Sequence, residues 1–210
     1  MSRDGAPPLR YLALGDSYTI GEGIGPDGRW PLLLAGALRA GAVALDDPLI
    51  VATTGWTTDE LDAAIDAAPP EGVFDLVSLL IGVNNQYRGR DVAQYRHQFD
   101  GLLARAAGFA GGRAGRVLVL SIPDWGVTPF ARQSGRDRAQ IARELDAYNA
   151  AAREACGARG IAFVDITAAS RAHGGEVEML AEDGLHPSAA MYAQWVRLAL
   201  PVARRLLSRP

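Results

Sequence analysis

The chain has 210 residues, 49% of them hydrophobic and 21% charged, and its 21 basic residues, all arginine, stand against 24 acidic residues for a formal net charge of -3. A chain of this length buries enough apolar surface to fold as one globular domain over residues 1–210, which excludes a disordered or fibrous protein. The acidic balance also excludes the basic stripe by which nucleic-acid-binding proteins hold their partners, so we expect no nucleic-acid partner.

Short apolar runs alternate with longer amphipathic segments along the chain. The runs are bounded by Gly, Pro, Asp or Thr, as buried strands are, and the longer segments place apolar residues at helical spacing. In chain order, the pattern predicts a strand at 10–14, a helix at 31–40, a strand at 49–52, a helix at 58–67, a strand at 74–81, a helix at 92–107, a strand at 116–122, a helix at 136–156, a strand at 161–166 and a helix at 188–207. The predicted fold class is therefore α/β, a three-layer α/β/α sandwich around a central five-stranded parallel sheet.

Residues suited to chemistry follow the predicted strands. Ligands of an open parallel sheet bind outside the carboxyl ends of its strands, where loops and helix N-termini converge. Ser17 follows the first strand, Gly55 the second and Asn84 the third, and an Asp-x-x-His at 183–186 precedes the last helix. We expect these residues to meet at one edge of the sheet.

This set of residues fits acyl transfer. A serine hydroxyl becomes a good nucleophile when an imidazole takes its proton, and the imidazole needs a carboxylate to fix its tautomer. Ser17, His186 and Asp183 fit these three roles, because a spacing of three lets one turn of chain hold the last two together. The main-chain N–H groups of Ser17 and Gly55 and the side-chain amide of Asn84 are candidates for the oxyanion hole.

With these residues assigned, the chain resembles the SGNH (GDSL) serine hydrolases, whose fold is flavodoxin-like. The family's nucleophile motif is matched by Gly15-Asp16-Ser17, and its C-terminal motif by Asp183 and His186. Its Gly and Asn donors are matched by Gly55 and by Asn84 in Gly82-Val83-Asn84. The blocks occur in the family's order over nearly the whole chain.

The resemblance implies a serine esterase that hydrolyses carboxylic esters of small molecules through a covalent acyl-enzyme on Ser17. The family also includes carbohydrate O-acetylesterases, lysophospholipases and thioesterases, and the sequence does not choose among them. Asn85 stands where the family often has Asp, which leaves the role of this position open. A catalytically silent flavodoxin-like binding module is the non-enzymatic alternative, but such a module has no reason to keep the four blocks together.

The loop after the fourth predicted strand indicates which length of acyl chain the site accepts. Residues 123–135 carry few large apolar side chains, among them Trp125 and Phe130. Trp125 either packs in the core or lines the acyl or alcohol pocket as a substrate-binding residue. A loop of this composition can wall a small pocket but not a long groove, so we expect a preference for short acyl chains.

Other candidate residues have simpler interpretations. Asp16 fits a turn and cap residue that orders the Ser17 loop, and His97 and His173 fit the surface. With His186 assigned to Ser17, no cluster of metal ligands remains, so we expect neither a metal nor another cofactor. Residues 23–28 match G-x-G-x-x-G but begin well after the first strand, so we interpret them as a rim loop and not a dinucleotide site.

The chain shows no pattern typical of export or membrane insertion. Its single cysteine, Cys156, lies in a predicted helix, where we expect a packed thiol. No apolar stretch approaches the about 20 residues of a membrane span. Charges of both signs in residues 1–5, followed by Pro7 and Pro8, do not fit a secretory signal. We therefore expect an unprocessed cytoplasmic protein without a membrane span, and the sequence leaves the oligomeric state open.

Overall fold

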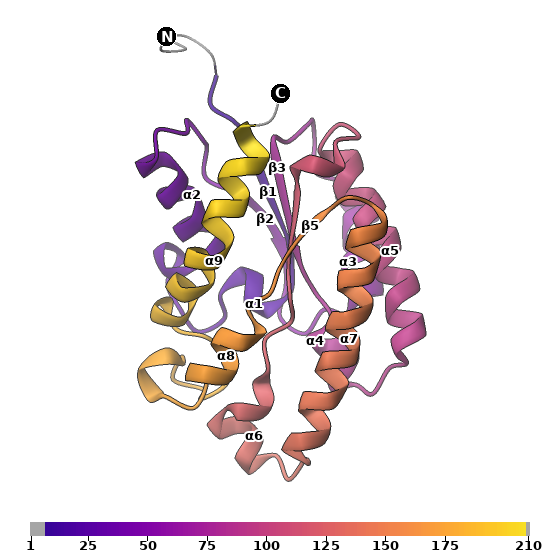
Figure 1. The fold of residues 1–210 in the computed structure, drawn as a ribbon, viewed down its shortest axis with the longest axis vertical. Helices are drawn as coiled ribbons and strands as arrows, with labels where there is room; N and C mark the ends of the chain where they lie inside the picture. The colour runs from indigo at the N-terminus through magenta and orange to yellow at the C-terminus, as the bar shows by residue number, and fades with distance from the viewer. Residues whose placement is uncertain (1–6, 209–210) are drawn as a thin grey trace.

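A central parallel sheet organises the computed structural model, which describes residues 7–208 (Figure 1). The strand order is β2-β1-β3-β4-β5, and every pair of neighbours runs parallel. The strands are β1 (Tyr11–Gly15), β2 (Leu49–Ala52), β3 (Leu76–Leu80), β4 (Val117–Leu120) and β5 (Ala162–Val164). Residues 1–5, on which the expectation of an unprocessed N-terminus rests, lie outside the described residues.

Long helices cover both faces of the sheet (Figure 1). Helices α2 (Trp30–Ala40) and α9 (Ala189–Ser208) lie on one face, and α3 (Thr58–Ala67), α5 (Val92–Phe109) and α7 (Arg138–Ala158) lie on the other. Side chains cap several of these helices: Asp91 and Asp137 accept N–H groups of the first turns of α5 and α7, and Thr57 and Glu60 form a capping box at α3. The predicted three-layer sandwich is confirmed.

The core explains why the strands are continuously apolar. All residues of β1, β3 and β4 are buried, whereas the edge strands β2 and β5 are partly exposed. Each helix buries the stripe that its periodicity predicts, as Tyr95, Phe99 and Leu102 of α5 show with exposures of 1% or less. Cys156 is buried in α7, where burial raises the pKa of its thiol to about 12, so the packed thiol is confirmed. Within residues 7–208, every helix is too short or too polar to cross a bilayer.

The structure adds short helices at one end of the sheet that periodicity does not predict. They are α1 (Ser17–Ile20), α4 (Val83–Tyr87), α6 (Pro129–Gln133) and α8 (Thr167–His173). They follow β1, β3, β4 and β5 in the chain, and α6 and α8 lie toward the end of the molecule opposite the two termini (Figure 1). Segments of four to seven residues are too short to show a helical stripe. The predicted rim loop at 23–28 contains one 3-10 turn, Pro26–Gly28.

This topology places a ligand site between β1 and β3. The chain reverses its direction of winding there, because β2 lies on one side of β1 while β3, β4 and β5 follow on the other. The loops on the carboxyl side of such a switch point diverge and leave a crevice. Ser17 follows β1 and Asn84 follows β3, so both residues border this crevice.

Candidate active site

The segment that carries Ser17 turns sharply from strand to helix. Asp16 follows the last residue of β1 and caps α1, because its Oδ1 accepts the main-chain N–H of Tyr18 at 3.0 Å. Ser17 is the first residue of this helix and is 5% exposed. The expectation that Asp16 is a turn and cap residue is confirmed, and the cap fixes where the Ser17 side chain emerges.

Asp16 also places a titratable group beside Ser17. The carboxyl is fully buried, and its Oδ2 has no hydrogen-bond partner among the described residues. Burial raises the pKa of Asp16 to about 7, against the opposing effect of the N–H groups of Tyr18 and Gly82. Asp16 therefore changes charge near neutral pH, which matters for any pH profile of this site.

The Asp183–His186 pair lies in a tight turn before α9. Oδ2 of Asp183 lies 2.5 Å from Nδ1 of His186, and its Oδ1 accepts the N–H groups of Leu185 and His186 at 2.9 Å each. Burial raises the pKa of Asp183, but the hydrogen bonds from His186 and from the main chain outweigh it, and the net pKa lies below the ordinary value. An ionised carboxylate only accepts, so Nδ1 carries the proton and Nε2 is left as the acceptor.

The ring of His186 is held from the other side by an aromatic contact. Tyr18, the residue after Ser17, packs edge-on against it with 5.7 Å between ring centroids. Only 12% of the His186 side chain is exposed. Ser17 and His186, which are far apart in the sequence, thus line the same cavity.

The two remaining donor candidates border the same cavity. Gly55 lies in a turn after β2 with a φ of +87°, where glycine is favoured. Asn84 lies in the first turn of α4, and its Nδ2 donates to the carbonyl of Trp56 at 2.9 Å. An amide nitrogen has two protons, so one remains for a ligand. Gly82 precedes this turn with a φ of +130°, and a Cβ there would lie 2.6 Å from the Tyr95 ring.

The cavity has a volume of about 250 Å³ and an aromatic wall. Trp125 is 2% exposed and lines the cavity beside Tyr87 and Phe130, whose ring centroids lie 5.4 and 6.1 Å from its own. Its Nε1 donates to Gln86 Oε1 at 2.9 Å. Trp125 is thus packed in the core and also lines the cavity, so each of its two interpretations describes part of its environment.

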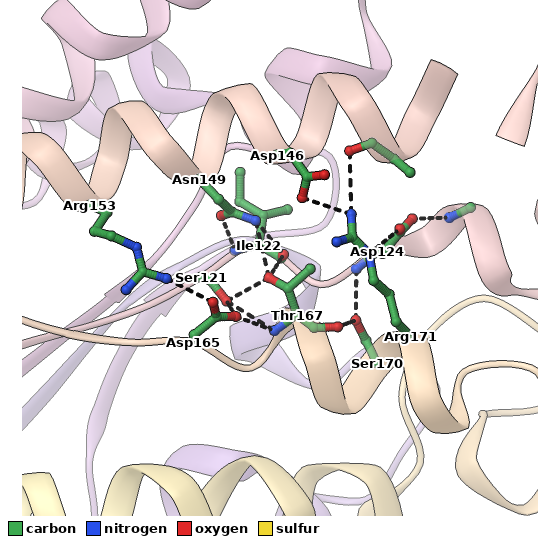
Figure 2. Close-up of polar contacts among 12 residues, drawn as sticks. Ser121, Ile122, Asp124, Asp146, Asn149, Arg153, Asp165, Thr167, Ser170 and Arg171 are labelled. Atoms are coloured by element: carbon green, nitrogen blue, oxygen red, sulfur yellow. Dashed lines mark hydrogen bonds and ion pairs between the residues drawn. The ribbon is translucent and has the colours of Figure 1, made fainter. Parts of the chain in front are cut away.

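A polar network fixes the loop that carries Trp125 (Figure 2). Asp124 accepts from Gly126 N and from Arg171 Nε at 2.8 Å each, and its own N–H donates to Ser170 Oγ at 2.8 Å. Figure 2 also shows Asn149 of α7 bonded to both main-chain groups of Ile122, at 2.8 and 3.0 Å. The segment after β4 is therefore bonded to α7 and α8 directly before Trp125.

The structure brings all the predicted site residues together. Ser17, Gly55, Asn84, Trp125 and His186 line one cavity, and Asp183 stands behind His186. His97 is exposed and His173 pairs with Glu176 at 2.9 Å, away from the cavity. Among residues 7–208, no group of three or more His, Cys, Asp or Glu side chains is placed to hold a metal ion.

Some lining residues do not follow from the motifs. They are Tyr18, Thr54, Val83, Tyr87, Phe130 and Leu185, of which Phe130 alone is singled out by the loop's composition. Val83 and Tyr87 lie four residues apart in α4, so they share a face. That spacing is the signal that would have found Tyr87, once a helix after the third strand is assumed.

Comparisons with known proteins agree with this fold. The sequence profile of the GDSL-like lipase/acylhydrolase family matches residues 13–194. No curated protein matches the sequence significantly. Among solved structures, TesA superposes with a TM-score of 0.74 at 20% identity, covering 94% of this chain and 99% of its own.

Two further solved structures are similar over nearly their whole lengths. LAE5, an alpha/beta hydrolase enzyme from the metagenome of Lake Arreo in Spain, has a TM-score of 0.72 and 23% identity, with 97% of this chain and 98% of its own covered. Axe2, an acetylxylan esterase from Geobacillus stearothermophilus, has a TM-score of 0.68 and 19% identity, with 98% and 96% covered. At these identities the likeness shows the shared fold. With the family profile covering most of its length, the chain belongs to the GDSL-like lipase/acylhydrolase family.

Proposed function

We propose that the chain is a serine esterase that hydrolyses small, short-chain carboxylic esters through a covalent acyl-enzyme on Ser17. One observation carries the proposal: Ser17, the His186–Asp183 pair, and the donors Gly55 and Asn84 converge on one cavity from loops far apart in sequence. A binding module of the same fold would gain nothing from this convergence. Family membership supports ester hydrolysis.

In the proposed acylation step, Ser17 Oγ attacks the ester carbonyl carbon while His186 Nε2 takes the hydroxyl proton. The ionised Asp183, at 2.5 Å from Nδ1, stabilises the imidazolium that forms. The carbonyl oxygen gains negative charge and is stabilised by the N–H groups of Ser17 and Gly55 and by the Asn84 amide. His186 then gives the proton to the leaving alkoxide, and an acyl ester of Ser17 remains.

In the proposed deacylation step, a water molecule takes the place of the alcohol. His186 Nε2 accepts a proton from this water, whose oxygen attacks the acyl carbon, and the same donors stabilise the second tetrahedral intermediate. The proton then returns to Ser17 Oγ as the carboxylic acid leaves. Every proton moves between groups of this chain, substrate and water, so the proposed cycle needs no cofactor.

The cavity supports a preference for short acyl chains. Its volume of about 250 Å³ lies below the roughly 300–1,000 Å³ typical of sites for drug-sized ligands. Each acyl methylene gains about 0.8 kcal/mol only if it is removed from water. We expect p-nitrophenyl acetate, butyrate and hexanoate to show much higher kcat/KM than the laurate and palmitate, measured below the concentrations at which the long esters aggregate.

A cavity-enlarging variant provides the control for this preference. Phe130→Ala removes a ring that lines the cavity and is only partly buried, so it should raise the laurate-to-acetate ratio of kcat/KM. A wild-type kcat/KM that climbs steadily through laurate and palmitate would contradict the short-chain proposal and favour a lysophospholipase.

The pH profile tests the proposed general base. His186 must be neutral to accept the Ser17 proton, so kcat/KM should rise with pH to an alkaline plateau. The measurement is the initial rate of p-nitrophenyl acetate hydrolysis at subsaturating ester, across pH 5 to 9. A profile that falls across this range would contradict a histidine base.

Asp16 requires a control, because its pKa of about 7 falls in the same range. Asp16→Asn removes this titration but keeps a side-chain oxygen for the Tyr18 N–H, and asparagine is a good N-cap. We expect the rise of kcat/KM with pH to persist in Asp16→Asn. If the rise disappeared in this variant while activity remained, the titrating group would be Asp16 and not His186.

A further inference from the structure

The two proposed oxyanion donors beyond Ser17 come from strands that do not touch each other. Gly55 follows β2 and Asn84 follows β3, and β1 lies between these strands. The distance between Gly55 and Asn84 is therefore set by the loops that carry them and not by direct pairing of their strands. A glycine with positive φ also leaves the chain free to rotate at low energetic cost, so the direction of the Gly55 N–H needs contacts from outside its turn.

Arg88, the C-cap residue directly after helix α4, supplies such a contact. Its Nη2 donates to the Gly55 carbonyl at 2.7 Å, and its Nη1 donates to Glu60 Oε1 at 2.9 Å. Glu60 is itself fixed, because its Oε2 accepts the main-chain N–H of Thr57 at 2.9 Å in the capping box of α3. One guanidinium thus joins the helix that carries Asn84 to the Gly55 turn and to the start of α3.

Two neighbours in α4 hold the same segment. Asn84 Nδ2 donates to the Trp56 carbonyl at 2.9 Å, so α4 binds the consecutive carbonyls of residues 55 and 56. Asn85 is fully buried, accepts the Thr58 N–H at 3.1 Å and donates to Thr58 Oγ1 at 2.7 Å. The Arg88 side chain, in contrast, is 42% exposed. It can be changed without opening the core or removing a proposed donor.

We infer that Arg88 is a positioning residue for the proposed reaction, one that holds the Gly55 turn on α4 and so keeps the Gly55 N–H and the Asn84 amide aimed at one oxygen atom. The inference rests on the proposed esterase function. Arg88 stands behind Gly55, outside the set of described residues that line the cavity, so it acts through Gly55 and not on the substrate. Exposed ion pairs add little to stability, and a purely structural Arg88 would leave the kinetics unchanged.

The test compares two arginine variants. Arg88→Met removes the guanidinium but keeps the alkyl stem, and kcat for p-nitrophenyl acetate should fall roughly tenfold with KM within about twofold, because a misaligned donor weakens mainly the transition state. Arg88→Lys should recover part of kcat, since an ammonium group can reach one of the two acceptors. Arg105→Met is the matched control: Arg105 also pairs with carboxylates of α3, Asp62 at 2.8 Å and Asp66 at 2.6 Å, and it should keep the wild-type kcat.

A second readout separates positioning from stability. A short alkylboronic acid forms a tetrahedral adduct with a serine nucleophile, so its inhibition constant should rise in Arg88→Met by the factor by which kcat/KM falls. The urea midpoint should stay within error of that of Arg105→Met. An unchanged kcat in Arg88→Met, an equal loss in Arg105→Met, or an effect on KM alone would overturn the inference. An inactive wild-type chain would overturn the proposed function together with it, whereas an active wild type matched by Arg88→Met refutes the positioning role alone.

Discussion

Ser17→Ala is expected to lower kcat/KM for p-nitrophenyl esters by at least about 10³-fold, because the variant has no hydroxyl to form the acyl-enzyme. The residual rate would come from water attacking an ester held by the remaining donors. The same substitution should abolish labelling by a fluorophosphonate probe, which should add once per chain to the wild type. Intact-protein mass spectrometry measures the label, and initial rates measure the activity.

The structure offers a matched serine for this experiment. Ser208 is the exposed last residue of α9 and lies outside the described residues that line the cavity. Ser208→Ala should keep both labelling and turnover. Ser17→Ala should unfold at the same urea concentration as the wild type within error, since a single hydroxyl at the cavity is lost. Labelling of another serine at the wild-type rate in Ser17→Ala would show that Ser17 is not the nucleophile.

Periodicity predicts the layers of this fold because burial on both sheet faces leaves a strong pattern. The strand at 49–52 and the helix at 58–67 have the predicted bounds, while the other elements differ by at most two residues at either end. At the start of α7 a cap decides the end: Asp137 accepts the Ala139 N–H, so α7 begins at Arg138 and not at Arg136. Hydrophobic periodicity shows which residues are buried, but it does not show which carboxylate accepts a main-chain N–H and so caps a helix.

The residue type at position 85 is explained by its contacts and not by comparison with the family motif. Thr58 Oγ1 donates to Gln98 Oε1 at 2.6 Å, which commits its proton, so its partner at position 85 must donate. Asn85 donates there and accepts the Thr58 N–H at the same time. An ionised Asp has only acceptors, so in this chain the neutral amide completes the network without burying a charge. The sequence could not indicate this, because Thr58 and Asn85 are 27 residues apart.

The loops of the site are also positioned by contacts between residues far apart in the sequence. Several contacts that hold the Gly55 turn or the Trp125 loop join a helix to a loop far away in sequence, such as Trp125 to Gln86 across 39 residues. Apolar stripes place residues on a face of the sheet, but they do not pair one loop with another. The residues of the proposed catalytic site could be chosen from their motifs, whereas residues such as Arg88 and Tyr87, which match no motif, needed the structure.

Asn84→Ala is expected to lower kcat by roughly 10²- to 10³-fold with little change in KM, since an oxyanion donor acts mainly on the transition state. The Asn84 amide is held at 2.9 Å from the Trp56 carbonyl before any substrate arrives, so little reorganisation opposes its second proton as charge develops. Asn84→Asp keeps the size but replaces the donor with a carboxylate, and it should lose at least as much. Stopped-flow or steady-state rates with p-nitrophenyl acetate, together with urea midpoints, make the comparison.

Combining Asn84→Ala with Arg88→Met tests whether both substitutions act on one oxygen atom. With the Asn84 amide gone, the tetrahedral intermediate depends on the N–H groups of Ser17 and Gly55, so loosening the Gly55 turn should cost a larger factor in Asn84→Ala than it does in the wild type. Independent roles would instead give losses that simply multiply. An effect of Asn84→Ala confined to KM would make Asn84 a substrate-binding residue, and a kcat close to that of the wild type would remove it from the oxyanion hole.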